Sequence, residues 1–167
     1  MASKHPCNFR TGFGVDRHQL VSARKLILGG IEIESDLGSL GHSDADVLIH
    51  AICDSILGAA NLRDIGFHFP DTSEKFKDID SSILLKESLE LVHEKGYLVG
   101  NIDCTIMLES PKLSEFIPYI SKNIALLLKV DEDAVSIKAT RGEKVGPVGR
   151  REAIQAYCSC LIYLKES

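Results

Sequence analysis

The sequence predicts a single α/β domain, a two-layer sandwich in which a mixed β-sheet carries helices on one face. Segments with period-two alternation, typical of strands, are interleaved along the chain with segments whose apolar residues recur at helical spacing. The 167 residues are 44% hydrophobic and 26% charged, and they contain no low-complexity run, which fits one globular core. We therefore expect one domain over residues 1–167, with its core over residues 9–165.

Charge and cysteine content restrict the class of protein further. Nineteen Lys and Arg against 24 Asp and Glu give a net charge of -5, which argues against a nucleic-acid or anionic-membrane partner. No apolar run approaches the roughly 20 residues of a membrane span, and residues 1–8 lack the hydrophobic stretch of a secretory signal. The cysteines form no C-x-x-C pair; they are Cys7, Cys53, Cys104, Cys158 and Cys160. We expect free, mostly buried thiols and a cytoplasmic protein.

The N-terminal part of the chain predicts strands. Alternation indicates one strand over residues 9–17, and residues 25–33 indicate two short strand pieces on either side of a turn at Gly29-Gly30.

A helix is expected over residues 44–60, where Ser43 and Asp46 match an N-terminal capping box. His50 lies four residues after Asp46 and four before Asp54, so these side chains can share one polar stripe opposite the apolar face. A carboxylate on that stripe would orient the imidazole, although the spacing fits a solvated helix face equally well.

The next segment predicts a second helix and a strand. The helix covers residues 82–95 and ends at Gly96, a typical helix-ending glycine. The strand covers residues 102–108, and Ser110-Pro111 then has the order of a cap and first helical residue.

Pro118 should interrupt or restart the helix that follows. Further strands are expected over residues 135–140 and 153–164. The last of these is apolar on both faces, so we expect helices on one side and a neighbouring subunit on the other.

Asp16, His18 and His50 are candidate metal ligands. Residues 16 and 18 point to the same face of a strand because side chains alternate. One carboxylate and two imidazoles suit zinc, and three protein ligands leave a fourth position open to substrate, as in catalytic sites. The set indicates a metal-using enzyme, although Asp-x-His also occurs by chance and a lone histidine is more often an ordinary surface or core residue.

Polar residues also cluster in three loops, at residues 41–44, 64–71 and 138–150. Gly, Pro and Asp gather in turns for backbone reasons, so each loop taken alone is explained by turn chemistry. Their occurrence together with Asp-x-His favours a functional site.

Taken together, these motifs resemble the 2-C-methyl-D-erythritol 2,4-cyclodiphosphate synthase family, over nearly the whole chain from Phe9 to Lys165. The matching motifs are Gly12-Phe13-Gly14-Val15-Asp16-Arg17-His18, His42-Ser43-Asp44-Ala45-Asp46-Val47 with His50, and Asp64-Ile65-Gly66 leading into Phe69-Pro70-Asp71-Thr72.

The resemblance implies a homotrimer whose sheets pack around the threefold axis and whose active sites lie between adjacent subunits. The implied reaction converts 4-diphosphocytidyl-2-C-methyl-D-erythritol 2-phosphate to the 2,4-cyclodiphosphate plus CMP, in non-mevalonate isoprenoid biosynthesis. The 2-phosphate of the substrate attacks its own β-phosphorus, so the protein mainly folds the substrate and neutralises charge.

The resemblance also assigns site residues. It implies zinc at Asp16, His18 and His50, and a second metal, magnesium or manganese, at Glu143. Residues 108–114 would form the cytidine pocket of the neighbouring subunit. The residues implied to contact substrate are Asp16, His18, His42, Ser43, Asp64, Ile65, Gly66, Phe69, Asp71, Leu108, Pro111, Lys112, Leu113, Ala139, Thr140, Arg141, Glu143 and Arg150, with His42, Thr140 and Arg141 catalytic.

The chain departs from the family pattern in one stretch. Arg141 replaces a threonine that normally helps hold the diphosphate, so Arg141 either contacts phosphate itself, which we favour, or points away. Pro147 and Arg151 replace a phenylalanine and a small residue, in a segment that with Arg150 can line a cavity on the trimer axis. These changes leave the size and the ligand of that cavity open, so we make no prediction of a regulatory ligand.

Two other classes of protein remain compatible with the residues. One is a phosphoesterase that uses zinc-bound water, and it would release linear phosphate products. The other is a non-enzymatic nucleotide-binding protein with a structural metal, whose zinc would be fully ligated by protein.

Overall fold

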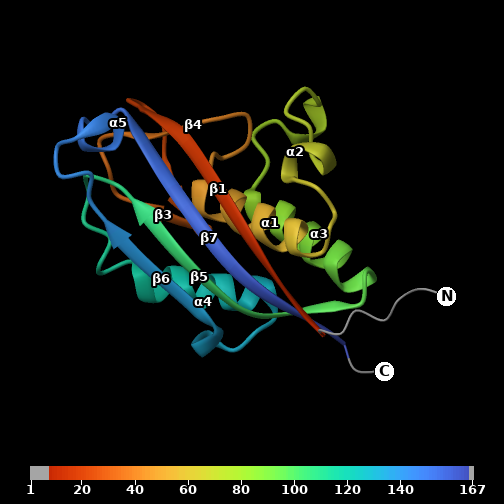
Figure 1. Cartoon of the computed structure of the whole chain (residues 1–167). Coiled ribbons are helices and arrows are strands. Elements are labelled where there is room, and N and C mark those ends of the chain that lie inside the picture. Colours follow the sequence, from red (N-terminus) through yellow and green to blue (C-terminus); the bar gives the residue numbers. More distant parts are fainter. Residues whose placement is uncertain (1–7, 166–167) are drawn as a thin grey trace.

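A five-stranded mixed sheet forms the centre of the computed structural model, which describes residues 8–165 (Figure 1). The strand order is β4 (Gly38–Leu40), β1 (Phe9–Val21), β7 (Ala153–Leu164), β5 (Tyr97–Met107) and β6 (Val135–Thr140). Only β5 and β6 run parallel, and the other neighbours are antiparallel. The predicted α/β class with a mixed sheet is confirmed.

The three long helices, α1 (Val47–Ala59), α3 (Ser81–Glu94) and α4 (Ile117–Leu128), lie on one face of the sheet (Figure 1). The smaller elements are a two-stranded sheet of β2 (Leu26–Leu28) and β3 (Ile31–Ile33), the short helices α2 (Ile65–His68) and α5 (Gly146–Gly149), and the 3₁₀ turns η1 (Glu74–Phe76) and η2 (Glu132–Ala134). None of the helices in the described part of the chain is long and apolar enough to cross a membrane.

The two faces of β1 have different surroundings because side chains alternate along a strand. Residues at even positions, including Asp16 and His18, point toward the helices, whereas the odd positions are largely open to solvent. On the open face Phe13 is 66% exposed and Val15 is 41% exposed, and Phe13 stacks on Tyr157 of β7. Residues 8–165 of a single chain therefore leave an apolar sheet face uncovered.

Two glycines on the helix-facing side of β1 allow α1 to pack unusually close to the sheet. A Cβ added to Gly12 would lie 1.9 Å from the carbonyl oxygen of Ser55, and one added to Gly14 would lie 2.0 Å from that of Ala51. No side chain fits at either distance, so the helix backbone rests directly on the strand. This contact sets the position of His50, the residue before Ala51.

Most predicted strands and helices are confirmed, with shifted ends. The strand over residues 153–164 and the strand over residues 135–140 have the predicted bounds, and the turn at Gly29-Gly30 separates β2 from β3. The helix predicted over residues 82–95 corresponds to α3. It begins one residue early, at Ser81, and ends before Gly96, whose φ is 82°.

The other strands and helices differ more from the prediction. The first strand runs on to Val21, and β5 begins at Tyr97. The helix expected at Pro111 does not form there, and α4 begins instead at Ile117 with Pro118 in its first turn, where proline is tolerated because no intrahelical N–H bond is needed. The short elements β4, α2 and α5 were not predicted.

The cysteine prediction is confirmed within the described residues. Cys53, Cys104, Cys158 and Cys160 are free and buried, and burial raises the pKa of the Cys53 thiol. Cys7 lies outside the described part of the chain.

Replacing Gly14 with alanine should lower the free energy of unfolding by about 1–3 kcal/mol or more, because the new methyl group must push α1 away from β1. Urea denaturation measures this change. Gly58→Ala is the matched control. Gly58 lies on α1, and no atom lies within 4 Å of a Cβ added there. Alanine at this position should stabilise the protein by about 0.5–1 kcal/mol. Equal stabilities of the two variants would contradict the close-packing argument.

Candidate active site

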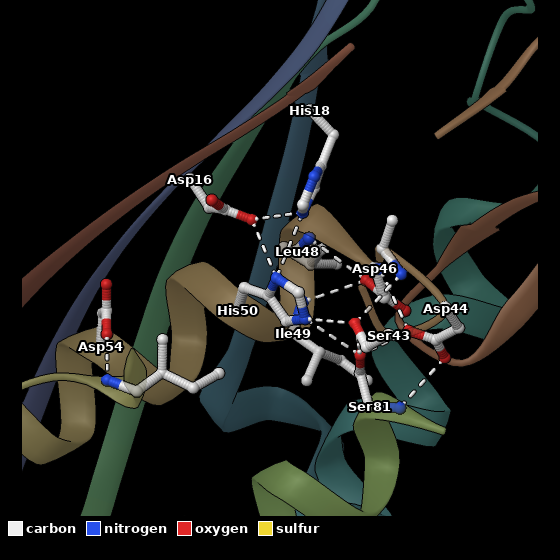
Figure 2. Close-up of polar contacts among 12 residues, drawn as sticks. Asp16, His18, Ser43, Asp44, Asp46, Leu48, Ile49, His50, Asp54 and Ser81 are labelled. Atoms are coloured by element: carbon white, nitrogen blue, oxygen red, sulfur yellow. Dashed lines mark hydrogen bonds and ion pairs between the residues drawn. The ribbon is translucent and has the colours of Figure 1, made fainter. Parts of the chain in front are cut away.

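Asp16 and His18 from β1 converge with His50 from α1 beneath the edge of the sheet (Figure 2). Asp16 Oδ2 lies 2.9 Å from His18 Nε2 and 3.0 Å from His50 Nδ1, and the two ring nitrogens are 3.2 Å apart. These three atoms lie within 4.8 Å of one another, so the group can hold a metal ion. The predicted association of the three side chains is confirmed.

The His18 nitrogen that points away from Asp16, Nδ1, is hydrogen-bonded to the backbone. His18 Nδ1 lies 3.0 Å from the carbonyl oxygen of Leu40 on β4, which can only accept, so Nδ1 carries the proton. The lone pair of Nε2 is therefore directed toward Asp16 and His50, as a metal ligand requires.

His50 is held in a similar way on its far side. Its Nε2 lies 3.1 Å from Ser43 Oγ and 3.0 Å from Ser81 Oγ, while Nδ1 faces Asp16 (Figure 2). With Nε2 as the donor, the Nδ1 lone pair is free for a metal. The donor set of one carboxylate and two imidazoles, each oriented by an outer partner, thus fits a zinc ion with an open fourth position.

The polar stripe expected along α1 is wrong. Asp46 is fully buried and caps the helix, accepting from the backbone N–H groups of Leu48 and Ile49 at 3.1 and 3.0 Å. Its second oxygen accepts from Gly30 N at 2.7 Å, and burial raises the pKa of Asp46 to about 6. Asp46 rather than Ser43 is the N-cap, because the helix starts three residues later than predicted.

Asp54 is also not the partner of His50. Its carboxylate accepts from the backbone N–H of Ile65 at 2.8 Å and lies apart from the cluster around His50 (Figure 2). It therefore ties α1 to α2 instead of orienting the imidazole.

The electrostatic balance of the site favours a bound cation. Burial opposes ionisation of Asp16, but hydrogen bonds and charge from His18 and His50 hold the pKa of this carboxyl well below its usual range. Burial opposes protonation of His50, but Asp16, with smaller contributions from Asp46 and Asp44, outweighs it and raises the pKa of the imidazole. The same negative surroundings stabilise a metal ion placed among these ligands.

A pocket of about 400 Å³ opens beside the three ligands, within the size range of small-molecule sites. Most of the residues predicted for substrate contact near the metal line it. They are His18, His42, Ser43, Ile65, Gly66, Phe69 and Asp71, joined by His50 and by Gly41, Phe76 and Leu84, which were not predicted.

Two of the residues predicted for this region have clear structural roles. Asp64 caps α2 by accepting from Phe67 N at 2.9 Å, and it is not among the residues that line the pocket. His42 lines the pocket and bonds through Nε2 to the carbonyl oxygen of Ser73 at 3.1 Å, which leaves Nδ1 as an acceptor.

A second pocket, of about 440 Å³, contains the other predicted group. It is lined by Leu108, Pro111, Lys112, Leu113, Ser114, Ile117, Ala139, Thr140, Arg141 and Glu143. The loop after β5 and the loop after β6 meet here, since Leu108 N donates to Thr140 O at 3.0 Å and Gly142 N donates to Glu109 Oε2 at 3.0 Å.

Within one chain the two pockets are separate. Asp16 on β1 is in register with Ala156 on β7. Ala156 is in register with Ile106 on β5, and Ile106 with Ala139 on β6. Three strand spacings put Asp16 and Ala139 about 14 Å apart across the sheet. Glu143 is exposed beside Arg141, with 3.9 Å between Glu143 Oε1 and Arg141 Nε, so it does not join the metal ligands of its own chain.

Three residues of the α5 region lie outside both pockets. Arg150 donates from Nε and Nη2 to the two carboxylate oxygens of Glu152, each at 2.9 Å, and Arg151 pairs with Asp36. Pro147 stands in the first turn of α5. The predicted substrate contact of Arg150 thus remains a prediction.

A mixed α/β domain with an open Asp-His-His site beside a small-molecule pocket is the architecture of a metal-dependent enzyme. The model of the YgbB family matches residues 9–163, and the chain belongs to this family. A relative from Phocaeicola vulgatus, named 2-C-methyl-D-erythritol 2,4-cyclodiphosphate synthase, is 60% identical over 92% of this chain and 96% of its own length.

Solved structures agree with this family assignment. The bifunctional IspDF from Campylobacter jejuni matches 95% of the chain with a TM-score of 0.91 at 42% identity, and the chain spans 43% of that protein. IspF from Plasmodium falciparum, solved as a CDP complex, matches 97% of the chain and 100% of its own with a TM-score of 0.84 at 34% identity.

We predict that purified protein binds about one zinc ion per chain and that His50→Ala abolishes this binding, because two remaining ligands do not make a stable site. Metal content after dialysis, measured by inductively coupled plasma mass spectrometry, tests this. His93→Ala on α3 is the control and should keep its zinc. Retention of zinc by the His50 variant would show that the ion sits elsewhere.

Proposed function

We propose that this chain is a 2-C-methyl-D-erythritol 2,4-cyclodiphosphate synthase. The observation that carries the proposal is the Asp16, His18 and His50 group, held ready for a metal beside a pocket of suitable size, in a chain whose close relatives bear that name. The substrate is 4-diphosphocytidyl-2-C-methyl-D-erythritol 2-phosphate, and the products are the 2,4-cyclodiphosphate and CMP.

The reaction is intramolecular, so the chain supplies position and charge instead of a nucleophile. His42, Ser43, Ile65, Gly66, Phe69 and Asp71 line the pocket in which the methylerythritol part would fold back on the diphosphate. Zinc at the three ligands, with magnesium or manganese on the diphosphate, would supply Lewis-acid stabilisation of the charge that develops on phosphate oxygens. The Ser43 hydroxyl would orient those oxygens by donating to them, and His42 would do so through its Nε2–H, which in this structure points to the carbonyl oxygen of Ser73.

The cytidine part belongs in the second pocket, at residues 108–114 and 139–143, taken from a neighbouring subunit. The separation of about 14 Å between Asp16 and Ala139 within one chain supports this arrangement, and the CDP complex of the Plasmodium falciparum relative supports a cytidine diphosphate group as part of the ligand. The uncovered apolar face, with Phe9, Phe13 and Val15, is suited to pack against the same face of other subunits around a threefold axis. One active site would then use the zinc ligands of one subunit together with Thr140, Arg141 and Glu143 of the next.

Arg141 is proposed to bind phosphate in place of the usual threonine. Its side chain is 55% exposed and its only ion pair among the described residues is the loose one with Glu143, so the guanidinium is free to turn toward a diphosphate. Glu143 would hold a magnesium ion that offsets the charge of the same phosphates.

Phosphorus NMR of the protein with this substrate and magnesium tests the reaction. We expect cyclic diphosphate and CMP, and loss of turnover when zinc is chelated. Linear phosphate products would instead establish a phosphoesterase, and binding without turnover by zinc-loaded protein would establish a nucleotide-binding protein.

Arg141→Ala should lower turnover about a hundredfold, the loss typical of removing one donor to a developing negative charge. Lys122→Ala removes an equal charge from the exposed side of α4 and should leave turnover unchanged. Steady-state release of CMP measures both variants. Unchanged turnover in the Arg141 variant would reject its phosphate role.

Mixed oligomers test the shared site. Co-expression of His50→Ala chains with Arg141→Ala chains, purified through two different tags, should restore activity well above that of either parent, because some sites combine two intact halves. Asp16→Ala with His50→Ala is the matched pair that should stay inactive, since both changes damage the same half-site. Absence of recovery in the first mixture would place the complete site within one chain.

A further inference from the structure

We propose that Ser81 and Asp44 are positioning residues that hold His50 in the tautomer and orientation needed for metal binding. This inference rests on the proposed metal-dependent function and assigns roles to two residues that lie outside the metal-ligand set. Ser81 is the first residue of α3 and is fully buried, and Asp44 lies in the loop before α1. Together they join α3 to the metal ligand on α1 (Figure 2).

Ser81 is fixed by two hydrogen bonds to one carboxylate. Its backbone N–H donates to Asp44 Oδ2 at 3.0 Å, and its hydroxyl donates to Asp44 Oδ1 in a short contact. Asp44 Oδ1 also accepts from Asp46 N at 3.2 Å, which keeps the carboxylate in place at the start of α1. The position of Ser81 Oγ is thus set by a bridge to the half-buried carboxylate of Asp44.

This bridge decides which nitrogen of His50 carries the proton. A serine hydroxyl has one hydrogen, and that of Ser81 is committed to Asp44. Ser81 Oγ can therefore only accept from His50 Nε2, 3.0 Å away, which places the imidazole proton on Nε2. The lone pair of Nδ1 is then directed at Asp16 and His18, where the metal would bind.

Ser43 does not impose the same choice. Its hydroxyl also lies 3.1 Å from His50 Nε2, and it accepts from Ala45 N at 3.2 Å, but its hydrogen is not committed to a carboxylate. With Ser81 removed, Ser43 could donate to an unprotonated Nε2, and the proton would be free to move to Nδ1. That tautomer blocks the metal-binding lone pair.

Zinc affinity of Ser81→Ala, measured by competition with a chromophoric chelator, tests the inference. We expect affinity to fall about 10–100-fold, the loss typical when the outer partner of a metal-bound histidine is removed. Ser88→Ala is the matched control, because it makes the same change at an equally buried serine on α3 and should leave affinity unchanged.

Nitrogen-15 NMR of histidine-labelled, metal-free protein shows which ring nitrogen of His50 carries the proton. A loss of packing alone would not change this. Because Asp16 raises the pKa of this imidazole, spectra are recorded above that pKa, where the neutral wild-type ring should appear as the Nε2–H tautomer and the Ser81 variant should shift toward Nδ1–H. Thermal unfolding is measured alongside to confirm that each variant is folded.

Asp44→Asn provides a second, independent variant, because an amide cannot accept from both the hydroxyl and the N–H of Ser81. It should lower zinc affinity in the same direction, whereas Asp54→Asn, which removes a carboxylate whose charge also acts on His50, should change affinity much less. Wild-type affinity with the wild-type tautomer in folded Ser81 and Asp44 variants would overturn the inference. Failure of the wild-type protein to bind zinc at all would instead overturn the proposed metal site.

Discussion

The close contact between α1 and β1 is the constraint on which the rest of the site depends. Gly12 and Gly14 let the carbonyl groups of Ser55 and Ala51 occupy the space that side chains would fill. His50 directly precedes Ala51, so this contact brings its ring to within 3.0 Å of Asp16. Asp16 and His18 on the strand are 32 or more residues away in sequence from His50 on the helix. Rigid elements such as these hold metal ligands in position more accurately than loops do.

The negative charge of the site explains why the proposed chemistry needs cations. Asp16, Asp44 and Asp46 all act on His50, and the whole chain carries a net charge of -5. A substrate with a diphosphate and a further phosphate would be repelled by these carboxylates unless metal ions stood between them. The carboxylates nevertheless have defined partners: the buried Asp46 accepts from backbone N–H groups, Asp44 accepts from Ser81 and Asp46 N, and Asp16 faces the two imidazole nitrogens.

The sequence predicted those features that depend on local pattern. The last strand has its predicted bounds because its alternation is unbroken, and α3 ends where Gly96 supplies a left-handed residue. Asp16, His18 and His50 were found because both residue type and strand spacing pointed to them. The partners of His50 were missed, since Ser81 lies 31 residues away on another helix and only the tertiary packing of α3 on α1 brings it near. Asp46 and Asp54 had the right helical spacing, but capping and the link to α2 occupy them.

An anomalous difference map at the zinc absorption edge, from crystals of the protein, tests the central claim most directly. We expect one strong peak per chain, at about 2.0–2.2 Å from Asp16 Oδ2, His18 Nε2 and His50 Nδ1, with the fourth position open to the pocket that contains His42 and Ser43. A peak fully enclosed by protein ligands elsewhere, or none at these three residues in zinc-loaded crystals, would contradict the account.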